Sequence, residues 1–125
     1  MASRPIFTPY PVIVNGDMSQ STVTSAVTII QNLSMVSYDV SWSGSSPVGV
    51  INVQVSNTYA QNADGTVKTA GNWSSLPLSN QFSISGNSGN GFIDIDANAG
   101  YAIRIQYVKT SGTGSLNATI NGKVQ

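Results

Sequence analysis

The amino-acid sequence predicts an all-β fold, a single antiparallel β-sandwich of the jelly-roll or immunoglobulin-like kind with about seven to nine short strands and an extended N-terminal arm. Three observations predict it. Apolar and polar residues alternate with a period of two through most of the chain. Clusters rich in glycine, asparagine and serine separate the alternating segments. No segment combines a capping residue with apolar residues at helical spacing.

The composition describes one neutral domain. Of the 125 residues, 40% are hydrophobic and only 8% are charged, and the formal net charge is zero. A soluble domain ordinarily carries about 25% charged residues, so hydroxyl, amide and backbone groups must keep this one in solution. The length suits a single domain that folds without a disulfide staple. We expect residues 15–125 to form that domain.

Residues 1–14 are expected to form the arm. Pro5, Pro9 and Pro11 fix the φ angle and remove backbone donors, which favours an extended chain. The apolar residues among these prolines need a surface to cover them. That surface belongs either to the same domain or to a neighbouring subunit, and the sequence leaves both alternatives open. The candidate interface residues are Ile6, Phe7, Tyr10 and Val12.

Alternation assigns the strands of the first half. Residues 35–43 and 48–57 each place apolar side chains on one face, and residues 44–47 have the composition of a turn. These two strands are therefore predicted to form a central hairpin. Residues 23–30 are predicted as a further strand. The side chains expected to face inward are Val27, Ile29, Val36, Tyr38, Val40, Trp42, Ile51, Val53 and Val55.

The second half is predicted to contain a long loop followed by shorter strands. Residues 59–72 are polar and predict the loop, with a small hairpin at Asp64–Gly65. Strands are expected at residues 73–78, 82–85, 92–97, 101–110 and 115–124, with turns at 86–91, 98–100 and 111–114. The side chains expected to face inward are Ile93, Ile95, Ala97, Tyr101, Ile103, Ile105, Tyr107, Leu116, Ala118 and Ile120.

The residue inventory argues against catalysis. Without histidine or cysteine the chain can build no Ser-His triad, no thiolate nucleophile and no cysteine-based metal site. Its five basic residues are scattered and form no stripe for nucleic acid. No apolar run approaches the ~20 residues of a membrane-spanning helix. We expect no enzyme activity, no cofactor, no nucleic-acid partner and no membrane span.

The carboxylates leave one question open. Asp94 and Asp96 alternate onto the same face of their strand. Together with Asp39 or Asp64 they have the oxygen ligands that Ca²⁺ takes, or they are solvated surface residues, and the sequence does not decide between these alternatives. Arg104 is expected on an outer face, where it would pair with Asp94 or Asp96 on a neighbouring strand.

Four aromatic residues are candidates for a platform on which sugar rings stack. Trp42 and Tyr101 belong to inward-facing sets, so core packing accounts for them. Tyr59 and Trp73 flank the polar loop and are expected to be exposed. They are the candidate glycan-contact residues.

Four stretches of the chain resemble a known family. Residues 42–44 (WSG), 47–57 (PVGVINVQVSN), 73–76 (WSSL) and 100–120 are similar to a β-sandwich module of small bacteriophage virion structural proteins. The best-marked part is YAIRIQYVKTSGTG, which begins at Tyr101. The resemblance covers roughly residues 20–125, and the proline-rich start has no clear place in it.

The resemblance implies a virion structural role without catalytic residues, such as capsid decoration, a minor head protein, or a tail or spike component. Such a protein is made in the host cytoplasm and needs neither a signal peptide nor a disulfide. The expected partners are capsid or other virion proteins and further copies of the chain, joined through the arm and the sheet edges. The alternative function is a carbohydrate-binding module that aids attachment to host or surface glycans.

Overall fold

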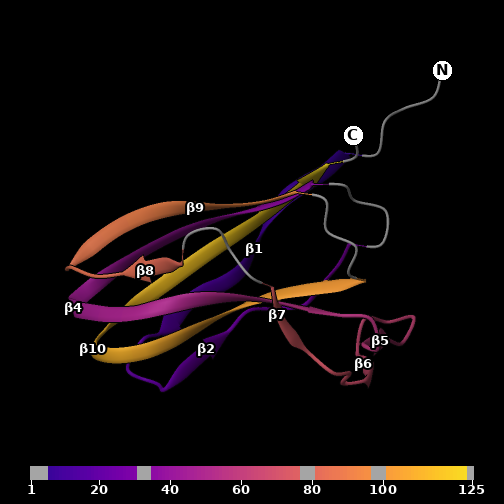
Figure 1. Ribbon diagram of the computed structural model, residues 1–125, viewed down its shortest axis with the longest axis horizontal. Coiled ribbons are helices and arrows are strands. Elements are labelled where there is room, and N and C mark those ends of the chain that lie inside the picture. Colours follow the sequence, from indigo (N-terminus) through magenta and orange to yellow (C-terminus); the bar gives the residue numbers. More distant parts are fainter. Residues whose placement is uncertain (1–5, 31–34, 77–80, 97–100, 124–125) are drawn as a thin grey trace.

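The computed structural model describes residues 6–30, 35–76, 81–96 and 101–123. The regular elements in these ranges are all β-strands (Figure 1), which confirms the all-β prediction. No helix in this part of the chain is suited to crossing a membrane. The strands are β1 (Ile6–Asp17), β2 (Thr22–Thr24), β3 (Thr28–Ile29), β4 (Met35–Ser56), β5 (Ala60–Gln61), β6 (Val67–Thr69), β7 (Ser74–Leu76), β8 (Phe82–Ile84), β9 (Ser88–Asp96) and β10 (Ala102–Lys123).

Two long strands organise the fold. β4 and β10 each contain 22 residues and pair antiparallel along their whole length. Both strands bend back near their middles, and the two bends lie opposite each other. Each strand therefore contributes one half to each of two layers (Figure 1). The predicted hairpin turns at residues 44–47 and 111–114 are therefore wrong, because the chain runs through both segments as a bent strand. The two halves of β4 pair with β10 and not with each other.

The strand order is that of a jelly roll. One layer has the order β1, second half of β10, first half of β4, β9. The other has β2 and β3, first half of β10, second half of β4, then β7 and β8. Eight segments counted along the chain thus give the orders 1-8-3-6 and 2-7-4-5. This is the double Greek key of a jelly roll and not the immunoglobulin arrangement, so the sandwich is of the first predicted kind.

The bend has a local cause in each long strand. Ser46 has a φ of 51° and Gly112 a φ of 81°, both in the left-handed region. The pairing register shifts on either side of Ser111. The buried apolar residues have even numbers in the first half of β4 and odd numbers in the second half, so the inward face changes phase at this corner.

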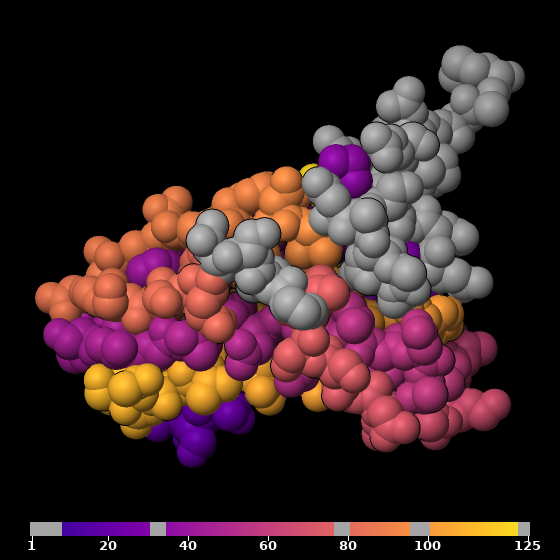
Figure 2. Space-filling view, in the orientation of Figure 1, coloured from indigo at the N-terminus to yellow at the C-terminus, as the bar shows by residue number. Residues whose placement is uncertain are grey.

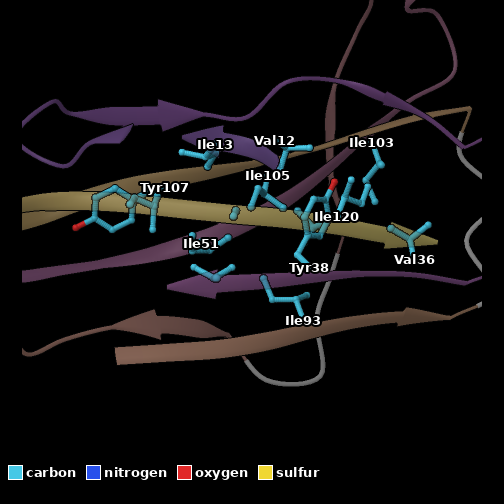
Figure 3. Packing of buried hydrophobic residues seen from close by; sticks show 14 of the residues in the cluster. Val12, Ile13, Val36, Tyr38, Ile51, Ile93, Ile103, Ile105, Tyr107 and Ile120 are labelled. Atoms are coloured by element: carbon cyan, nitrogen blue, oxygen red, sulfur yellow. The ribbon is translucent and has the colours of Figure 1, made fainter. Parts of the chain in front are cut away.

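A single apolar core fills the space between the layers (Figure 3). Most of the inward faces predicted from alternation are confirmed there. Tyr38, Ile51, Ile105 and Ile120 are completely buried. The buried members of the cluster are Val12, Ile13, Met18, Ile30, Val36, Tyr38, Val40, Ile51, Val53, Ile84, Ile93, Ile95, Ile103, Ile105, Tyr107, Leu116, Ala118 and Ile120.

The prediction for residues 23–30 assigns the wrong alternate residues to the inward face. Thr28 and Ile30 are buried there, whereas Val27 and Ile29 are only half-buried. The cause is Ser25, which interrupts the strand between β2 and β3. Its backbone N–H donates to the Ile105 carbonyl at 2.9 Å, and its Oγ accepts the Ile105 N–H at 2.9 Å. A side chain replaces a backbone partner at this point, so the alternation shifts by one residue.

Two smaller predictions have opposite outcomes. The hairpin at Asp64–Gly65 is confirmed, because β5 pairs with β6 and the Asp64 carboxylate accepts hydrogen bonds from the N–H and Oγ of Thr66 at 3.0 and 2.6 Å. The turn at residues 86–91 is too long, because β9 already begins at Ser88. The predicted turn at residues 98–100 lies outside the described residues.

The segment predicted as an arm is an edge strand of this domain. β1 pairs antiparallel with β10, from Ile6 opposite Lys123 to Asp17 opposite Ser115. Val12 and Ile13 are 7% and 5% exposed and point into the core (Figure 3). Of the two alternatives, packing on the same domain therefore holds for this strand, and the boundary at residue 14 is not seen. Residues 1–5 lie outside the described residues.

Candidate binding surfaces

The structure brings the two candidate glycan-contact residues together. The rings of Tyr59 and Trp73 lie 5.7 Å apart between centroids with an interplanar angle of 57°. Gly71, with a φ of 78°, permits this approach, since a Cβ on it would lie 2.6 Å from the Tyr59 nitrogen. The Trp73 indole Nε1 donates to the Ala70 carbonyl at 2.9 Å and fixes the ring.

Arg104 completes this cluster, and the sequence did not indicate it. Its guanidinium carbon lies 4.2 Å from the centroid of the Trp73 ring, within the range of a cation–π contact. Its Nε donates to Gln54 Oε1 at 2.7 Å, because β10 places Arg104 directly opposite Gln54 of β4. Partial burial lowers the pKa of the Arg104 guanidinium. Alternation shows that Arg104 faces outward, but its neighbours depend on strand pairings that no local pattern reveals.

The expected pairing of Arg104 with Asp94 or Asp96 is wrong. Arg104 lies in the half of β10 that pairs with β2 and with the second half of β4. Asp94 belongs to β9, which pairs with the first half of β4 in the other layer. The predicted turn at residues 98–100 had placed these strands side by side, whereas each of them pairs with a different half of β4.

Exposure within the ring cluster is uneven. Tyr59 is only 6% exposed, so its expected exposure is wrong, and its hydroxyl accepts a hydrogen bond from Gln61 Nε2 at 3.1 Å. Trp73 and Arg104 are half-buried. A ligand at this surface would meet the rim of the Trp73 ring, the Arg104 guanidinium and the Gln54 amide. These groups suit hydroxyl and carboxylate oxygens.

The outer face of the same layer is covered by neutral polar groups. Gln106 Nε2 donates to Thr24 Oγ1 at 3.1 Å, and Gln81 Nε2 donates to Asn52 Oδ1 at 3.2 Å. The first contact joins β10 to β2, and the second joins β4 to the segment before β8. The face offers amides and hydroxyls without a concentrated charge.

The carboxylates are distributed over the molecule. Asp94 and Asp39 are exposed on β9 and β4, where Asp94 lies opposite Ser37 and Asp39 opposite Phe92. Asp64 caps the β5–β6 hairpin, far along the chain from this sheet. The side chain of Asp96 lies outside the described residues. Among the side chains that are described, no three carboxylates come together as a metal site.

The first layer carries a small hollow beside an exposed aromatic ring. The hollow has a volume of about 220 Å³ and is lined by residues of β4, β9 and β10, including Met35, Phe92, Asp94 and Asn121. Ligand pockets are ordinarily about 300–1,000 Å³, so this one is small for a ligand. Phe92 is 59% exposed on its rim. Alternation with the inward-facing Ile93 and Ile95 puts Phe92 on the outward face of its strand, but the sequence did not single it out as a surface feature.

The candidate interface residues of β1 differ in how far they are exposed. Tyr10 is 37% exposed, and its hydroxyl lies 2.8 Å from Thr28 Oγ1. Val12 is buried in the core of its own domain, so it is not on a free surface. The backbones of Ile6 and Phe7 pair with Lys123 and Gly122, and their side chains lie outside the described residues.

Comparison with known proteins yields likeness in structure only. No protein-family model matches the chain, and no curated protein matches it. The SPBc2 prophage-derived protein YomS has 15% identity and a TM-score of 0.47 over 97% of this chain and 96% of its own. The VP2 subviral particle of infectious bursal disease virus has 12% identity and a TM-score of 0.49 over 100% of this chain and 34% of its own. The cleaved adhesin domain of Lys-gingipain from Porphyromonas gingivalis has 12% identity and a TM-score of 0.38 over 83% of this chain and 63% of its own.

These likenesses assign no function to the chain. Identities are 15% or lower and TM-scores lie below 0.5. The chain also spans only 34% of the length of the VP2 chain. Function must therefore be argued from the geometry and chemistry of the chain itself.

Proposed function

We propose that this chain is a non-enzymatic structural protein of a bacteriophage virion, made in the host cytoplasm, that joins capsid or other virion subunits through the edges of its sheets. The observation that carries the proposal is the jelly-roll strand order in a chain without charge excess. Jelly rolls recur in viral capsid domains and in lectins.

The chemistry of the surface supports the same role. A neutral chain with 8% charged residues has little electrostatic repulsion between copies. Natural sheets protect their edges from other chains with charged residues, especially lysine, and with proline. This chain has few of the former, which suits a protein whose edges are covered by neighbouring subunits.

The sheet edges replace the N-terminal arm in this proposal. The sequence suggested that residues 1–14 reach a neighbour, but Val12 and Ile13 are part of the core. A deletion of residues 1–14 would therefore remove a strand of the sandwich. It would test folding before it tested assembly.

The proposal is tested on purified particles. The chain should copurify with virions at a fixed ratio to the major capsid protein when particles are banded in a density gradient and quantified by mass spectrometry. A chain that stays in the soluble fraction while complete particles form would contradict the proposal. A tagged version added to particles that lack the protein separates incorporation from mere co-sedimentation.

A second candidate function is binding of glycans, favoured by the Trp73–Arg104 contact beside a face of amides and hydroxyls. Under this hypothesis Trp73→Ala should abolish binding on a glycan array without unfolding the protein. Phe92→Ala is the matched control, because it removes an exposed aromatic ring from the other layer. Equal binding by wild type and Trp73→Ala would reject the hypothesis.

A further inference from the structure

The two edges of the first layer are built differently. β1 forms one edge, and it carries Pro9 and Pro11 and three register shifts against β10. Proline and irregular pairing are the ordinary means of protecting an edge strand. β9 forms the other edge. It has 9 residues in an unbroken register with β4 and contains neither proline nor lysine.

The free side of β9 presents backbone groups in a regular pattern. The Gly44 N–H donates to the Asn87 carbonyl at 2.7 Å, in the register that β9 continues along β4. Hydrogen-bonded and non-bonded pairs alternate in an antiparallel ladder. The odd-numbered residues of β9 therefore bond to β4. The backbone N–H and C=O of the even-numbered residues Ser88, Asn90, Phe92, Asp94 and Asp96 point away from it.

Within the described ranges no strand pairs with this free side. In Figure 1, β9 lies along the outer margin of its layer, and in Figure 2 its residues follow the upper left rim of the molecule. Phe92, at the middle of this strand, is 59% exposed. Unpaired backbone groups and an exposed ring at the same residue mark this edge for another strand.

We propose that β9 pairs antiparallel with β9 of a second copy of this chain, about a two-fold axis at Phe92. The inference rests on the proposed function, in which sheet edges join subunits, and it names the partner of one edge. Paired in this way, the two copies form one continuous sheet of twice the width, with both outer faces on the same side. The interface is isologous, so it closes at two copies.

The sequence of β9 is complementary to itself in this register. Phe92 is the midpoint of Ser88–Asp96, so only a two-fold axis at Phe92 pairs the strand over its full length. Asp94 then lies opposite Asn90, and the two Phe92 side chains form a cross-strand pair. An axis at Asp94 would instead place two carboxylates opposite each other. In each copy, five residues have backbone groups that point away from β4. The two copies together can therefore form about ten backbone hydrogen bonds, which is the number in a typical interface.

The oligomeric state tests the pairing directly. Sedimentation equilibrium of the full chain should give twice the monomer mass of 13.0 kDa, with a concentration-dependent return to monomer. Phe92→Lys should raise the dissociation constant by about 30-fold or more, because it places two like charges opposite each other at the centre. Val67→Lys is the control, since Val67 is similarly exposed at 57% but lies in β6. Unchanged thermal melting of both variants confirms that neither is misfolded.

The register is tested separately with a spin label. The chain contains no cysteine, so Asn90→Cys gives a single labelling site. With the axis at Phe92, the two labelled residues are offset by four residues along the strand, or about 14 Å. Dipolar spectroscopy should show a short inter-label distance of this order. A dimer without it uses another interface and overturns the proposal.

Two further outcomes would decide whether β9 pairs with a second copy. A monomer at all concentrations overturns the pairing, as does equal weakening by Phe92→Lys and Val67→Lys. Neither result concerns incorporation into particles, which is measured by copurification with virions. Loss of copurification with an intact β9 dimer would refute the virion role and leave the pairing in place.

Discussion

Gly112 lies directly against the backbone of Ser46 at the corner where both long strands fold back. A Cβ on Gly112 would collide with the Ser46 carbonyl oxygen and lie 2.6 Å from its carbon. Both residues have left-handed φ angles, 81° for Gly112 and 51° for Ser46. This backbone contact between β4 and β10 lies at the corner where the paired strands pass from one layer to the other.

Gly112→Ala should therefore destabilise the fold strongly. The substitution adds left-handed strain and forces the two strands apart, and we expect a loss of about 2–4 kcal/mol in the free energy of unfolding. Gly65→Ala is the control, because Gly65 has a φ of 90° and no atom within 4 Å of the added Cβ. It should lose only about 1–2 kcal/mol. Urea unfolding of both variants makes the measurement, and equal losses would mean that the corner contact is unimportant.

The edge strand β1 should contribute core energy. Ile13 is 5% exposed, whereas its neighbour Val14 is 66% exposed. Ile13→Ala is expected to cost about 2–4 kcal/mol, and Val14→Ala less than about 0.5 kcal/mol. The midpoint of chemical denaturation distinguishes them. If Ile13→Ala were as stable as wild type, residues 6–14 would behave as the detachable arm that the sequence suggested.

The sequence predicted side-chain faces better than connections. Alternation identified Val36, Tyr38 and Ile105 as core residues, because the period of a strand is local information. It failed at Gly44–Pro47, where glycine and serine fit both a hairpin turn and a bent strand. The difference depends on β10, which lies far along the chain and pairs with both halves of β4. The Arg104–Trp73 contact was missed for the same reason, since strand order decides which outward side chains meet.

Arg104 and Trp73 should be energetically coupled. A double-mutant cycle with Arg104→Gln and Trp73→Leu is expected to give about 0.5–1 kcal/mol of interaction free energy, the strength of a partly exposed cation–π contact. Pairing Arg104→Gln with Phe92→Leu, in the other layer, supplies the control. Those two changes should add within about 0.5 kcal/mol. Full additivity of the first pair would show that the 4.2 Å stacking contributes nothing to stability.

Two buried tyrosines should respond in opposite ways to loss of their hydroxyls. Tyr38 and Tyr107 are both fully buried, but the Tyr107 hydroxyl donates to the Val48 carbonyl at 3.1 Å. The Tyr38 hydroxyl has no hydrogen-bond partner among the described residues. Tyr107→Phe should cost about 1 kcal/mol, because it leaves a carbonyl without its donor. Tyr38→Phe should be neutral or stabilising by up to about 1 kcal/mol. It removes a hydroxyl that loses its hydrogen bonds to water on folding and gains none in the folded state.

Alkaline pH should separate Tyr38→Phe from wild type further. Burial, with a smaller contribution from Tyr10, raises the pKa of the Tyr38 phenol well above its usual value of 10.0. The unfolded chain therefore releases this proton at a lower pH than the folded chain does. Ionisation of Tyr38 therefore leaves the stability unaffected below pH 10, and the folded state loses stability progressively as the pH rises above that value. Unfolding free energies measured from pH 8 to pH 11 should fall less steeply for Tyr38→Phe than for wild type. Identical slopes would place this phenol in contact with solvent and contradict its burial in the core.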